Sequence, residues 1–267
     1  MAKPTIKAVL LSPQRELGGK PLLVAGPSLG TSTVVWTEAA SLLGADYDVI
    51  GWDLPGHGVS PAAAETFSVA ELADAVVELV DSILPGALFH YAGVSLGAAT
   101  GLQLAIKHGQ RLKTLSVQCT GAKIGTPEGW LERAETVRTQ GTAVMIQGSA
   151  QRWFAEGFMD REPEISSRLL HSLRDADRFS YAFCCEALAG FDVRAELGGI
   201  TVPTQALAGV EDTVVPPSFA QEIADGVNAG GGSAVVVALD GVAHLAPAEA
   251  PGVVADLMRA FMQEAGE

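Results

Sequence analysis

Two short stretches of the chain place a serine between two glycines, in the pattern Gly-X-Ser-X-Gly. One spans residues 26–30 around Ser28, and the other spans residues 93–97 around Ser95. A serine in this pattern acts as a nucleophile when it lies on a sharp turn between a strand and a helix, with its hydroxyl exposed to a carbonyl carbon. The chemistry that these residues offer is acyl transfer through serine.

The residues around each serine favour Ser95 as the nucleophile. The apolar run 88–92 leads into Ser95, and the small residues of 97–101 begin a helix whose N-terminus would face a developing negative charge. Ser28 follows Pro27, which fixes its own φ, and the residues after Ser28 are a poor start for a helix. We therefore predict that Ser95 carries the reaction.

The loop around Ser28 is a candidate for a role other than that of nucleophile. Serine hydrolases of this pattern take one oxyanion-binding N–H from the residue after the nucleophile and another from the loop after an early strand. These would be the backbone N–H groups of Leu96 and Leu29. The alternative is an ordinary glycine loop, and Ser28 is a candidate neighbour of the substrate.

A serine nucleophile needs a histidine base, and a carboxylate must orient that histidine. His244 follows the last predicted strand and keeps the chain order serine, acid, histidine that is typical of this arrangement. The other histidines fall in a loop before the nucleophile, in a strand, at a helix end and in a helical region: His57, His90, His108 and His171. We predict structural roles for these four.

The acid is expected in the loop after the next-to-last strand. Glu211 and Asp212 both lie there, and Asp240 precedes the histidine. Asp212 is favoured, because a short side chain at a strand exit can accept a hydrogen bond from histidine while the backbone turns. Glu211 and Asp240 remain alternatives. If one of the three carboxylates has no catalytic role, we interpret it as a solvated side chain in a turn.

The elements that position these residues alternate along the chain between strands and helices, which predicts an α/β fold with a mostly parallel central sheet and flanking helices. The strands are predicted at 21–25, 47–52, 87–92, 112–118, 203–208 and 234–239. Helices are predicted at 68–84, 96–107, 218–227 and 252–263, the first with a capping box formed by Ser68 and Glu71 and a hydrophobic staple formed by Phe67 and Leu72.

The strand alternation stops between residues 121 and 191, where the chain becomes charged, aromatic and helical in pattern. We interpret 121–191 as a helical cap inserted into a core made of 1–120 and 192–267. Most of the arginines in this region are expected to be solvated. Trp130 with Arg133, and Trp153 with Arg152, are the candidates for substrate contacts.

Composition excludes several classes of function. A formal net charge of −14 disfavours binding to nucleic acid or anionic membranes, since both need clustered Lys and Arg. No run of residues is long enough to span a membrane, and the apolar patch at 8–11, within residues 1–13, is not followed by a cleavage site, so a cytoplasmic protein is expected. The three cysteines, at positions 119, 184 and 185, lack metal-ligand spacing and predict buried or inert thiols.

These motifs resemble those of the α/β-hydrolase family over nearly the whole chain. The segments that carry the resemblance are Asp53-Leu54-Pro55-Gly56-His57-Gly58-Val59-Ser60, Gly93-Val94-Ser95-Leu96-Gly97, the Asp212 loop and His244. Within the family, Ser28-Leu29-Gly30-Thr31 with Trp36, the stretch from Ala122 to Trp130, and Arg152-Trp153-Phe154 resemble the 3-oxoadipate enol-lactonases of aromatic catabolism in the β-ketoadipate pathway.

The resemblance implies hydrolysis of a small lactone by Ser95, His244 and Asp212, with no cofactor and no metal. Sister hydrolases, either carboxylesterases or carbon–carbon bond hydrolases, are the nearest alternatives. A non-catalytic ligand-binding member of the same fold is an alternative of another class. An anionic lactone would need a local cation to offset the net charge of the protein.

Overall fold

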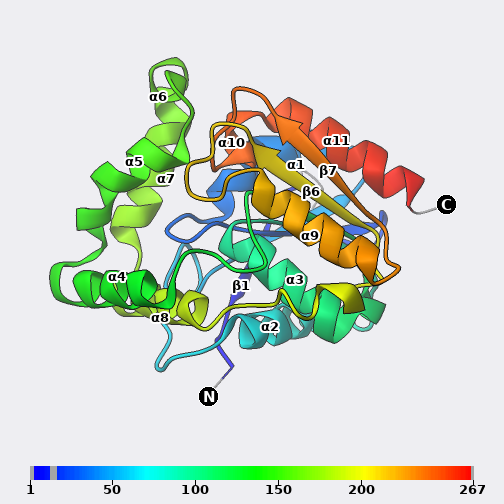
Figure 1. The fold of residues 1–267 in the computed structure, drawn as a ribbon, viewed down its shortest axis with the longest axis horizontal. Helices are drawn as coiled ribbons and strands as arrows, with labels where there is room; N and C mark the ends of the chain where they lie inside the picture. The colour runs from blue at the N-terminus through cyan, green and yellow to red at the C-terminus, as the bar shows by residue number, and fades with distance from the viewer. Residues whose placement is uncertain (1–2, 13–16, 266–267) are drawn as a thin grey trace.

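The computed structural model describes residues 3–12 and 17–265, which form a seven-stranded sheet with helices on both sides (Figure 1). The strands are β1 (Lys7–Leu10), β2 (Leu22–Gly26), β3 (Asp48–Asp53), β4 (Phe89–Val94), β5 (Leu112–Gln118), β6 (Thr204–Gly209) and β7 (Ala234–Leu239). Their order in the sheet is β1-β3-β2-β4-β5-β6-β7, and only β1 runs antiparallel to its neighbour. The predicted α/β class with a mostly parallel sheet is confirmed.

The burial of each strand follows from its place in the sheet. Every residue of β2, β3, β4 and β6 is buried, as expected for parallel strands that are covered on both faces. The two edge strands β1 and β7 are only partly buried. The rigid centre of the sheet therefore supports the loops that leave β2, β4, β5 and β6.

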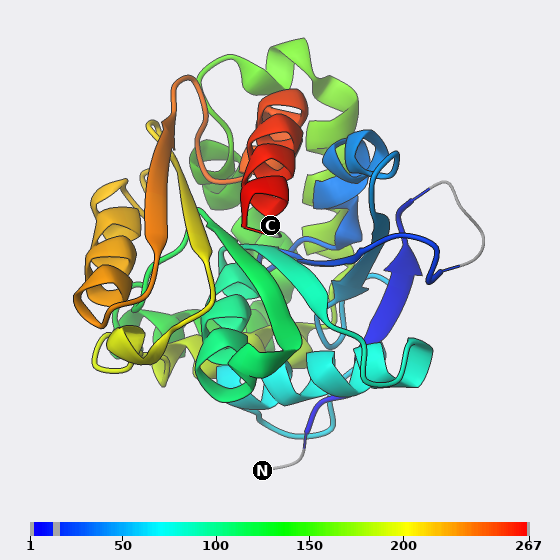
Figure 2. The same cartoon turned by 90° about the vertical axis from the view of Figure 1, so that its right-hand side faces the viewer.

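Two helical layers cover the sheet (Figure 2). On one face α1 packs against α11, and on the other α2 packs against α3, while α9 packs on β6 and β7. The helices of the core are α1 (Thr37–Leu43), α2 (Val69–Ile83), α3 (Leu96–His108), α9 (Ser218–Ala229), α10 (Ala246–Glu249) and α11 (Pro251–Glu264). Short 3-10 turns lie at Thr33–Trp36, Gly109–Arg111, Thr142–Met145 and Leu197–Gly199.

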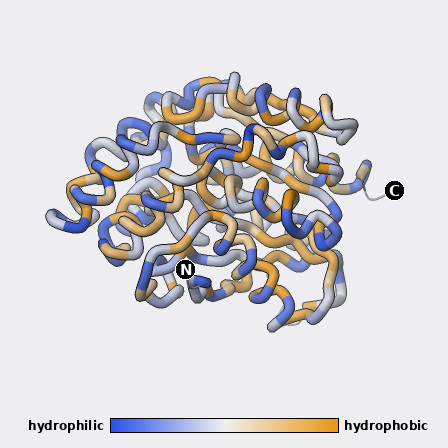
Figure 3. The backbone as a smooth tube through the Cα atoms, turned by 60° about the horizontal axis from the view of Figure 1, so that its bottom comes forward, coloured by the Kyte–Doolittle hydropathy of each residue, from blue (hydrophilic) through white to orange (hydrophobic). Residues whose placement is uncertain are grey.

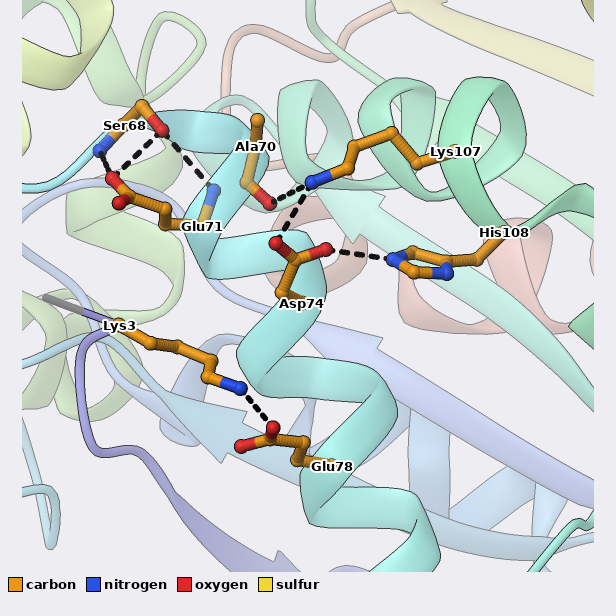
Figure 4. Close-up of polar contacts among 8 residues, drawn as sticks. All are labelled: Lys3, Ser68, Ala70, Glu71, Asp74, Glu78, Lys107 and His108. Atoms are coloured by element: carbon orange, nitrogen blue, oxygen red, sulfur yellow. Dashed lines mark hydrogen bonds and ion pairs between the residues drawn. The ribbon is translucent and has the colours of Figure 1, made fainter. Parts of the chain in front are cut away.

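The start of α2 contains the predicted capping box (Figure 4). The backbone N–H of Glu71 donates to the Ser68 hydroxyl at 3.2 Å, and the Ser68 N–H donates to the Glu71 carboxylate at 2.8 Å. These bonds satisfy N–H groups that a helix start leaves without partners. One turn further along, Asp74 accepts from Lys107 and pairs with His108, which ties α2 to the end of α3. Lys3 pairs with Glu78 on the same helix.

Five helices stand between β5 and β6, to one side of the sheet in Figure 1. They are α4 (Pro127–Gln140), α5 (Ile146–Trp153), α6 (Phe158–Arg161), α7 (Pro163–Asp175) and α8 (Arg178–Ala189). Hydrophilic and hydrophobic residues alternate within the turns of many helices, because such a helix buries one face and exposes the other (Figure 3). All five helices fall within 121–191, the region that we call the cap.

Among the described residues, the core contains three helices and strands that the sequence patterns did not indicate: β1, α1 and the four-residue α10. The edge strand β1 has four residues with no clean alternation, and α1 is a seven-residue helix without a side-chain cap. Of the N-terminal residues considered above, Met1, Ala2 and Pro13 lie outside the described part of the chain. Within that part, no helix combines the length and apolar character needed to cross a membrane.

Candidate active site

The carboxyl ends of β2 and β4 meet at the point where the strand order changes direction. From β2 the chain continues to β3 on one side, whereas β4 lies on the other side of β2, and Gly26 pairs with Gly93 in the register of these two strands. Ligands of open α/β sheets bind at such switch points, outside the carboxyl ends of the strands. The loop after Gly26 and the turn at Ser95 are therefore brought together where ligands bind to sheets of this kind.

Ser95 lies on a strained turn between β4 and α3. Its φ is 55° and its ψ is −116°, in a region that residues with side chains rarely adopt. The Ser95 N–H donates to the Gln118 carbonyl at 2.9 Å, and the Gly97 N–H donates to the Pro27 carbonyl at 2.9 Å. The turn is thus held from β5 on one side and from the loop after β2 on the other.

The glycines of the motif are required by close backbone contacts. A Cβ atom on Gly93 would lie 2.4 Å from the carbonyl carbon of Gly97, and one on Gly97 would lie 2.5 Å from that of Gly26. Both distances are shorter than any real carbon–carbon contact of this kind. The Gly-X-Ser-X-Gly pattern at 93–97 is therefore a steric requirement of this turn.

The two predicted oxyanion donors keep their N–H groups available. Within residues 3–12 and 17–265, neither the Leu29 N–H nor the Leu96 N–H donates to a protein acceptor. Leu96 is the first residue of α3, where the helix dipole favours negative charge. Ser28 is buried, and its carbonyl accepts from the N–H and the hydroxyl of Thr31, which shapes the turn that presents Leu29.

Asp212 and His244 form a buried hydrogen-bonded pair. Asp212 Oδ2 lies 2.8 Å from His244 Nδ1, and the side chains of Asp212 and His244 are 0% and 3% exposed. Asp212 Oδ1 accepts the N–H groups of Val214 at 2.8 Å and Val215 at 3.0 Å, so the acid loop holds the carboxylate in one orientation. This leaves the Nε2 atom of His244 as the ring nitrogen for proton transfer.

The alternative acids do not contact His244. Glu211 is exposed, and its Oε2 accepts the backbone N–H of Glu156 at 3.2 Å. Asp240 is also exposed. Glu211 is one residue from Asp212, and this change of position in the turn points its side chain elsewhere, whereas Asp240 follows a different strand, β7.

Each of the other four histidines has a structural setting of its own. His90 is buried in β4 with its Nδ1 2.8 Å from the Thr114 hydroxyl, His108 pairs with Asp74, and His171 is exposed on α7. His57 is fully buried, and its Nδ1 lies 2.9 Å from the Pro55 carbonyl. Burial lowers the pKa of His57 to about 4, so this ring is neutral at pH 7.

A cavity of about 430 Å³ is lined mainly by α4 and the loop before it. Trp130, Arg133 and Arg152, three of the predicted substrate-binding residues, all line it. Neither Ser95 nor His244 is part of the lining. The link to the acid loop is Val214, which lines the cavity and donates its N–H to Asp212.

The two arginines of the cavity have no carboxylate partner among the described residues. The Arg133 guanidinium lies 5.5 Å from the ring centres of both Trp130 and Tyr181, and it donates to the Tyr181 hydroxyl. The Arg152 side chain makes no hydrogen bond within the described part of the chain. Burial and, after it, the nearby charge of Arg133 lower the pKa of Arg152. Two positive charges therefore face a cavity that also has Glu132 in its wall, and among the described residues neither arginine is ion-paired with a carboxylate.

Trp153 does not form the second aromatic and arginine wall that its place beside Arg152 suggested. Consecutive helix residues point in different directions, and Trp153 is buried and absent from the cavity lining. Its ring instead lies beside Gly30, where an added Cβ would be 3.4 Å from it. The Trp153 carbonyl accepts the His244 N–H at 3.2 Å, so this residue joins the loop after β2 to the histidine loop.

Tyr181 is a residue of the site that the sequence patterns did not reveal. Burial raises the pKa of its hydroxyl, which stays neutral and accepts from Arg133. The ring also stacks on His57 at a centroid distance of 5.9 Å. Tyr181 lies about fifty residues from Arg133 in the sequence, and no local spacing indicates a contact between two helices whose packing is set by the fold.

Comparison with known proteins agrees with this architecture. Residues 22–257 match the model of the alpha/beta hydrolase family. The chain belongs to the alpha/beta hydrolase family. The strained serine turn, the mostly parallel sheet and the loops at its carboxyl edge are the features that this membership explains. The family match and the relatives show that the protein is a hydrolase.

Several members of the family are similar to this chain over most of its length. It is 38% identical to 3-oxoadipate enol-lactonase 2 of Acinetobacter baylyi over 196 residues, which are 73% of each chain. It is 30% identical over 213 residues to the putative carbamate hydrolase RutD of Variovorax paradoxus, covering 74% of this chain and 77% of that one. The crystal structure of the enol-lactonase from Burkholderia xenovorans LB400 superposes with a TM-score of 0.89 at 30% identity, covering 97% and 96% of the two chains.

Proposed function

We propose that this hydrolase opens 3-oxoadipate enol-lactone to 3-oxoadipate, with Ser95 as nucleophile, His244 as base and Asp212 as the acid that orients it. The observation that carries the proposal is the buried Asp212–His244 hydrogen bond of 2.8 Å at the same sheet edge as the strained turn of Ser95. The enol-lactonases among its relatives support this choice of substrate.

In the first half of the reaction, the Ser95 hydroxyl oxygen attacks the lactone carbonyl carbon while His244 Nε2 takes its proton. The carbonyl oxygen becomes negative and is stabilised by the N–H groups of Leu29 and Leu96. The tetrahedral intermediate then collapses, the ring carbon–oxygen bond breaks, and the enol oxygen takes the proton from His244. The product of this half is an acyl group on Ser95.

In the second half, His244 takes a proton from a water molecule that attacks the acyl carbon. A second tetrahedral intermediate forms at the same two N–H groups. Its collapse releases the acid and returns the proton to Ser95. An enol is a better leaving group than an alkoxide, so this chemistry needs no metal and no cofactor.

The substrate carboxylate is assigned to the two arginines of the cavity. The protein carries a net charge of −14, so an anion approaching it is repelled unless a local cation compensates. Arg133 and Arg152 supply that cation, and the carboxylate in turn relieves their mutual repulsion. Trp130 forms a flat wall beside Arg133. Trp153 and Ser28 lie outside the cavity lining and act through the loop after β2, because the Trp153 ring packs beside Gly30 and the Ser28 carbonyl accepts from Thr31.

This proposal also gives residues 121–191 the role of a cap on a core made of 1–120 and 192–267. The cap supplies Trp130, Arg133, Arg152 and Trp153, and the core supplies the groups that move protons. We assign the enzyme to the cytoplasm, where small-molecule catabolism takes place, and we infer that it needs neither nucleic acid nor a membrane as partner.

The decisive experiment compares the turnover of 3-oxoadipate enol-lactone with that of neutral aryl esters and of small carbamates. We expect the lactone to have the highest kcat/KM. A higher kcat/KM for a neutral aryl ester would indicate a carboxylesterase, and a higher value for a carbamate would follow the similarity to RutD. Failure of a serine-directed fluorophosphonate to label Ser95 would support a non-catalytic ligand-binding protein instead.

A further inference from the structure

Glu249 lies at the end of α10, five residues after His244, and its carboxylate folds back over the histidine loop. Its Oε1 accepts the backbone N–H groups of Ala243 at 3.2 Å and Leu245 at 3.0 Å. Its Oε2 accepts the N–H of Ala155 in the cap at 2.7 Å. One side chain therefore binds the residue before His244, the residue after it and the segment that follows α5.

The local sequence explains why this carboxylate is needed. α10 has only four residues, and Leu245, at its N-cap position, has no side-chain acceptor of its own. Such a short helix leaves its first N–H groups without intrahelical partners. Glu249 supplies the acceptor from the other end of the turn, in the way that the glutamate of a capping box reaches back to the N-cap N–H.

The surroundings of Glu249 show how its charge is accommodated. Burial raises the pKa of the Glu249 carboxyl, and the N–H groups of Ala155, Leu245 and Ala243 and the nearby His244 oppose this rise. A buried carboxylate that accepts three backbone N–H groups makes strong, charge-assisted hydrogen bonds. Its negative charge is also close to the ring that becomes positive when it takes the serine proton.

A second contact joins the same two segments. The His244 N–H donates to the Trp153 carbonyl at 3.2 Å, two residues before Ala155. The backbone of His244 is thus fixed from both sides by residues 153–155, once directly and once through Glu249. The Asp212 pair sets the rotation of the ring, but it does not set the position of the backbone that carries the ring.

We propose that Glu249 is a positioning residue of the reaction, which holds the backbone of His244 against the end of α5 so that the imidazole meets Ser95. The inference rests on the proposed function, in which His244 is the base. Glu249 does not touch substrate, and it acts only through His244.

Substitution by glutamine separates this role from simple stabilisation. An amide has one acceptor oxygen where the carboxylate has two, whereas three N–H donors from two directions face the side chain. In Glu249→Gln the amide NH₂ must therefore face either Ala155 or the histidine loop, and one of the two connections is lost. Glu211→Gln is a matched control, because the Glu211 side chain accepts only the N–H of the adjacent cap residue Glu156. Its one bond to the histidine loop, from its backbone N–H to the Val242 carbonyl at 2.9 Å, does not involve the substituted side chain.

The experiment measures kcat and KM on a neutral aryl ester, the melting temperature, and the downfield proton NMR signal of the hydrogen bond between His244 and Asp212. For Glu249→Gln we expect kcat to fall by about 10- to 100-fold, as for a catalytic group displaced by a fraction of an ångström, with KM nearly unchanged. The NMR signal should shift or broaden. Glu211→Gln should match the wild type in kcat and in the NMR signal.

A lower melting temperature with unchanged kcat and an unchanged NMR signal in Glu249→Gln would overturn the proposal, since Glu249 would then only stabilise the loop. If Glu249→Gln does not fold, Glu249→Asp provides the same measurements, because it keeps the charge and shortens the reach by one methylene. The NMR signal needs no turnover. A wild type that hydrolyses no lactone would therefore count against the proposed function and leave the test of Glu249 intact.

Discussion

Replacing Asp212 by asparagine should abolish the tautomer of His244 that accepts a proton. Asp212 Oδ1 accepts the N–H groups of Val214 and Val215, and Oδ2 faces His244 Nδ1. The two backbone N–H groups require an acceptor, so the asparagine oxygen should take the Oδ1 position and its NH₂ should face the ring. An NH₂ donor needs an acceptor at Nδ1, which moves the ring proton to Nε2.

With a proton already on Nε2, the imidazole cannot take another from the Ser95 hydroxyl. The same loss of the productive tautomer in a serine protease triad lowers kcat by about 10⁴-fold. We expect a fall of about 10³- to 10⁴-fold, which corresponds to about 4 to 5.5 kcal/mol of transition-state stabilisation. The fold should persist, because the acceptor that the acid loop needs is retained in Asp212→Asn.

The assay is steady-state hydrolysis of a neutral aryl ester, with circular dichroism to check the fold. Glu211→Gln is the control, since Glu211 contacts Glu156 and not His244, and it should keep nearly wild-type kcat. A folded Asp212→Asn variant that keeps more than a tenth of wild-type kcat would refute the reasoning. So would an equal loss in the two variants, because the acid would then be wrongly assigned.

Three further predictions concern other parts of the protein. Ser95→Ala should lower turnover by about 10³-fold or more, whereas Ser28→Ala should cost far less; the reverse order in the same ester assay would exchange their roles. Arg133→Ala or Arg152→Ala should raise KM for the anionic lactone by about 10-fold, the loss of a charge-assisted contact, and leave neutral esters nearly unaffected; equal effects on both substrates would assign the arginine to the support of the cap. The free energy of unfolding should fall as the pH drops from 6.5 towards 4, because His57 binds a proton in this window in the unfolded chain but not when it is buried. In thermal melts, the melting temperature of His57→Gln should therefore fall less over this pH range than that of the wild type.

The sequence predicted the large features of the fold because they depend on local patterns. Strands at 112–118 and 234–239 have the bounds expected, and the other predicted strands differ by one or two residues. The capping box at Ser68 was predicted because both of its partners lie within one helical turn. β1 was missed, since a four-residue edge strand is defined by its pairing with β3 and not by its own composition.

The residues of the site also divide into those that local sequence patterns indicate and those that only the packing of the fold brings together. The serine turn and the acid and histidine loops follow strands, so sequence order indicates them, and their catalytic roles remain predictions. The contact of Arg133 with Trp130 was expected, because the two lie one helical turn apart. Tyr181 was not found, because its partner Arg133 comes from another helix of the cap and its partner His57 comes from the core. Glu249 was not found, because its bond to Ala155 depends on the packing of the cap on the core.

The cavity wall and the proposed catalytic residues belong to different parts of the chain. Apart from Val214, every residue that lines the cavity lies between positions 124 and 152, whereas Ser95, Asp212 and His244 lie in loops of the sheet. Under the proposed function, changes in the wall are expected to alter which molecule is accepted and to leave the hydrogen bond between Asp212 and His244 in place. Such a separation lets one scaffold diverge among substrates by few mutations, and it marks α4 as the place where a designer seeking a new specificity should begin.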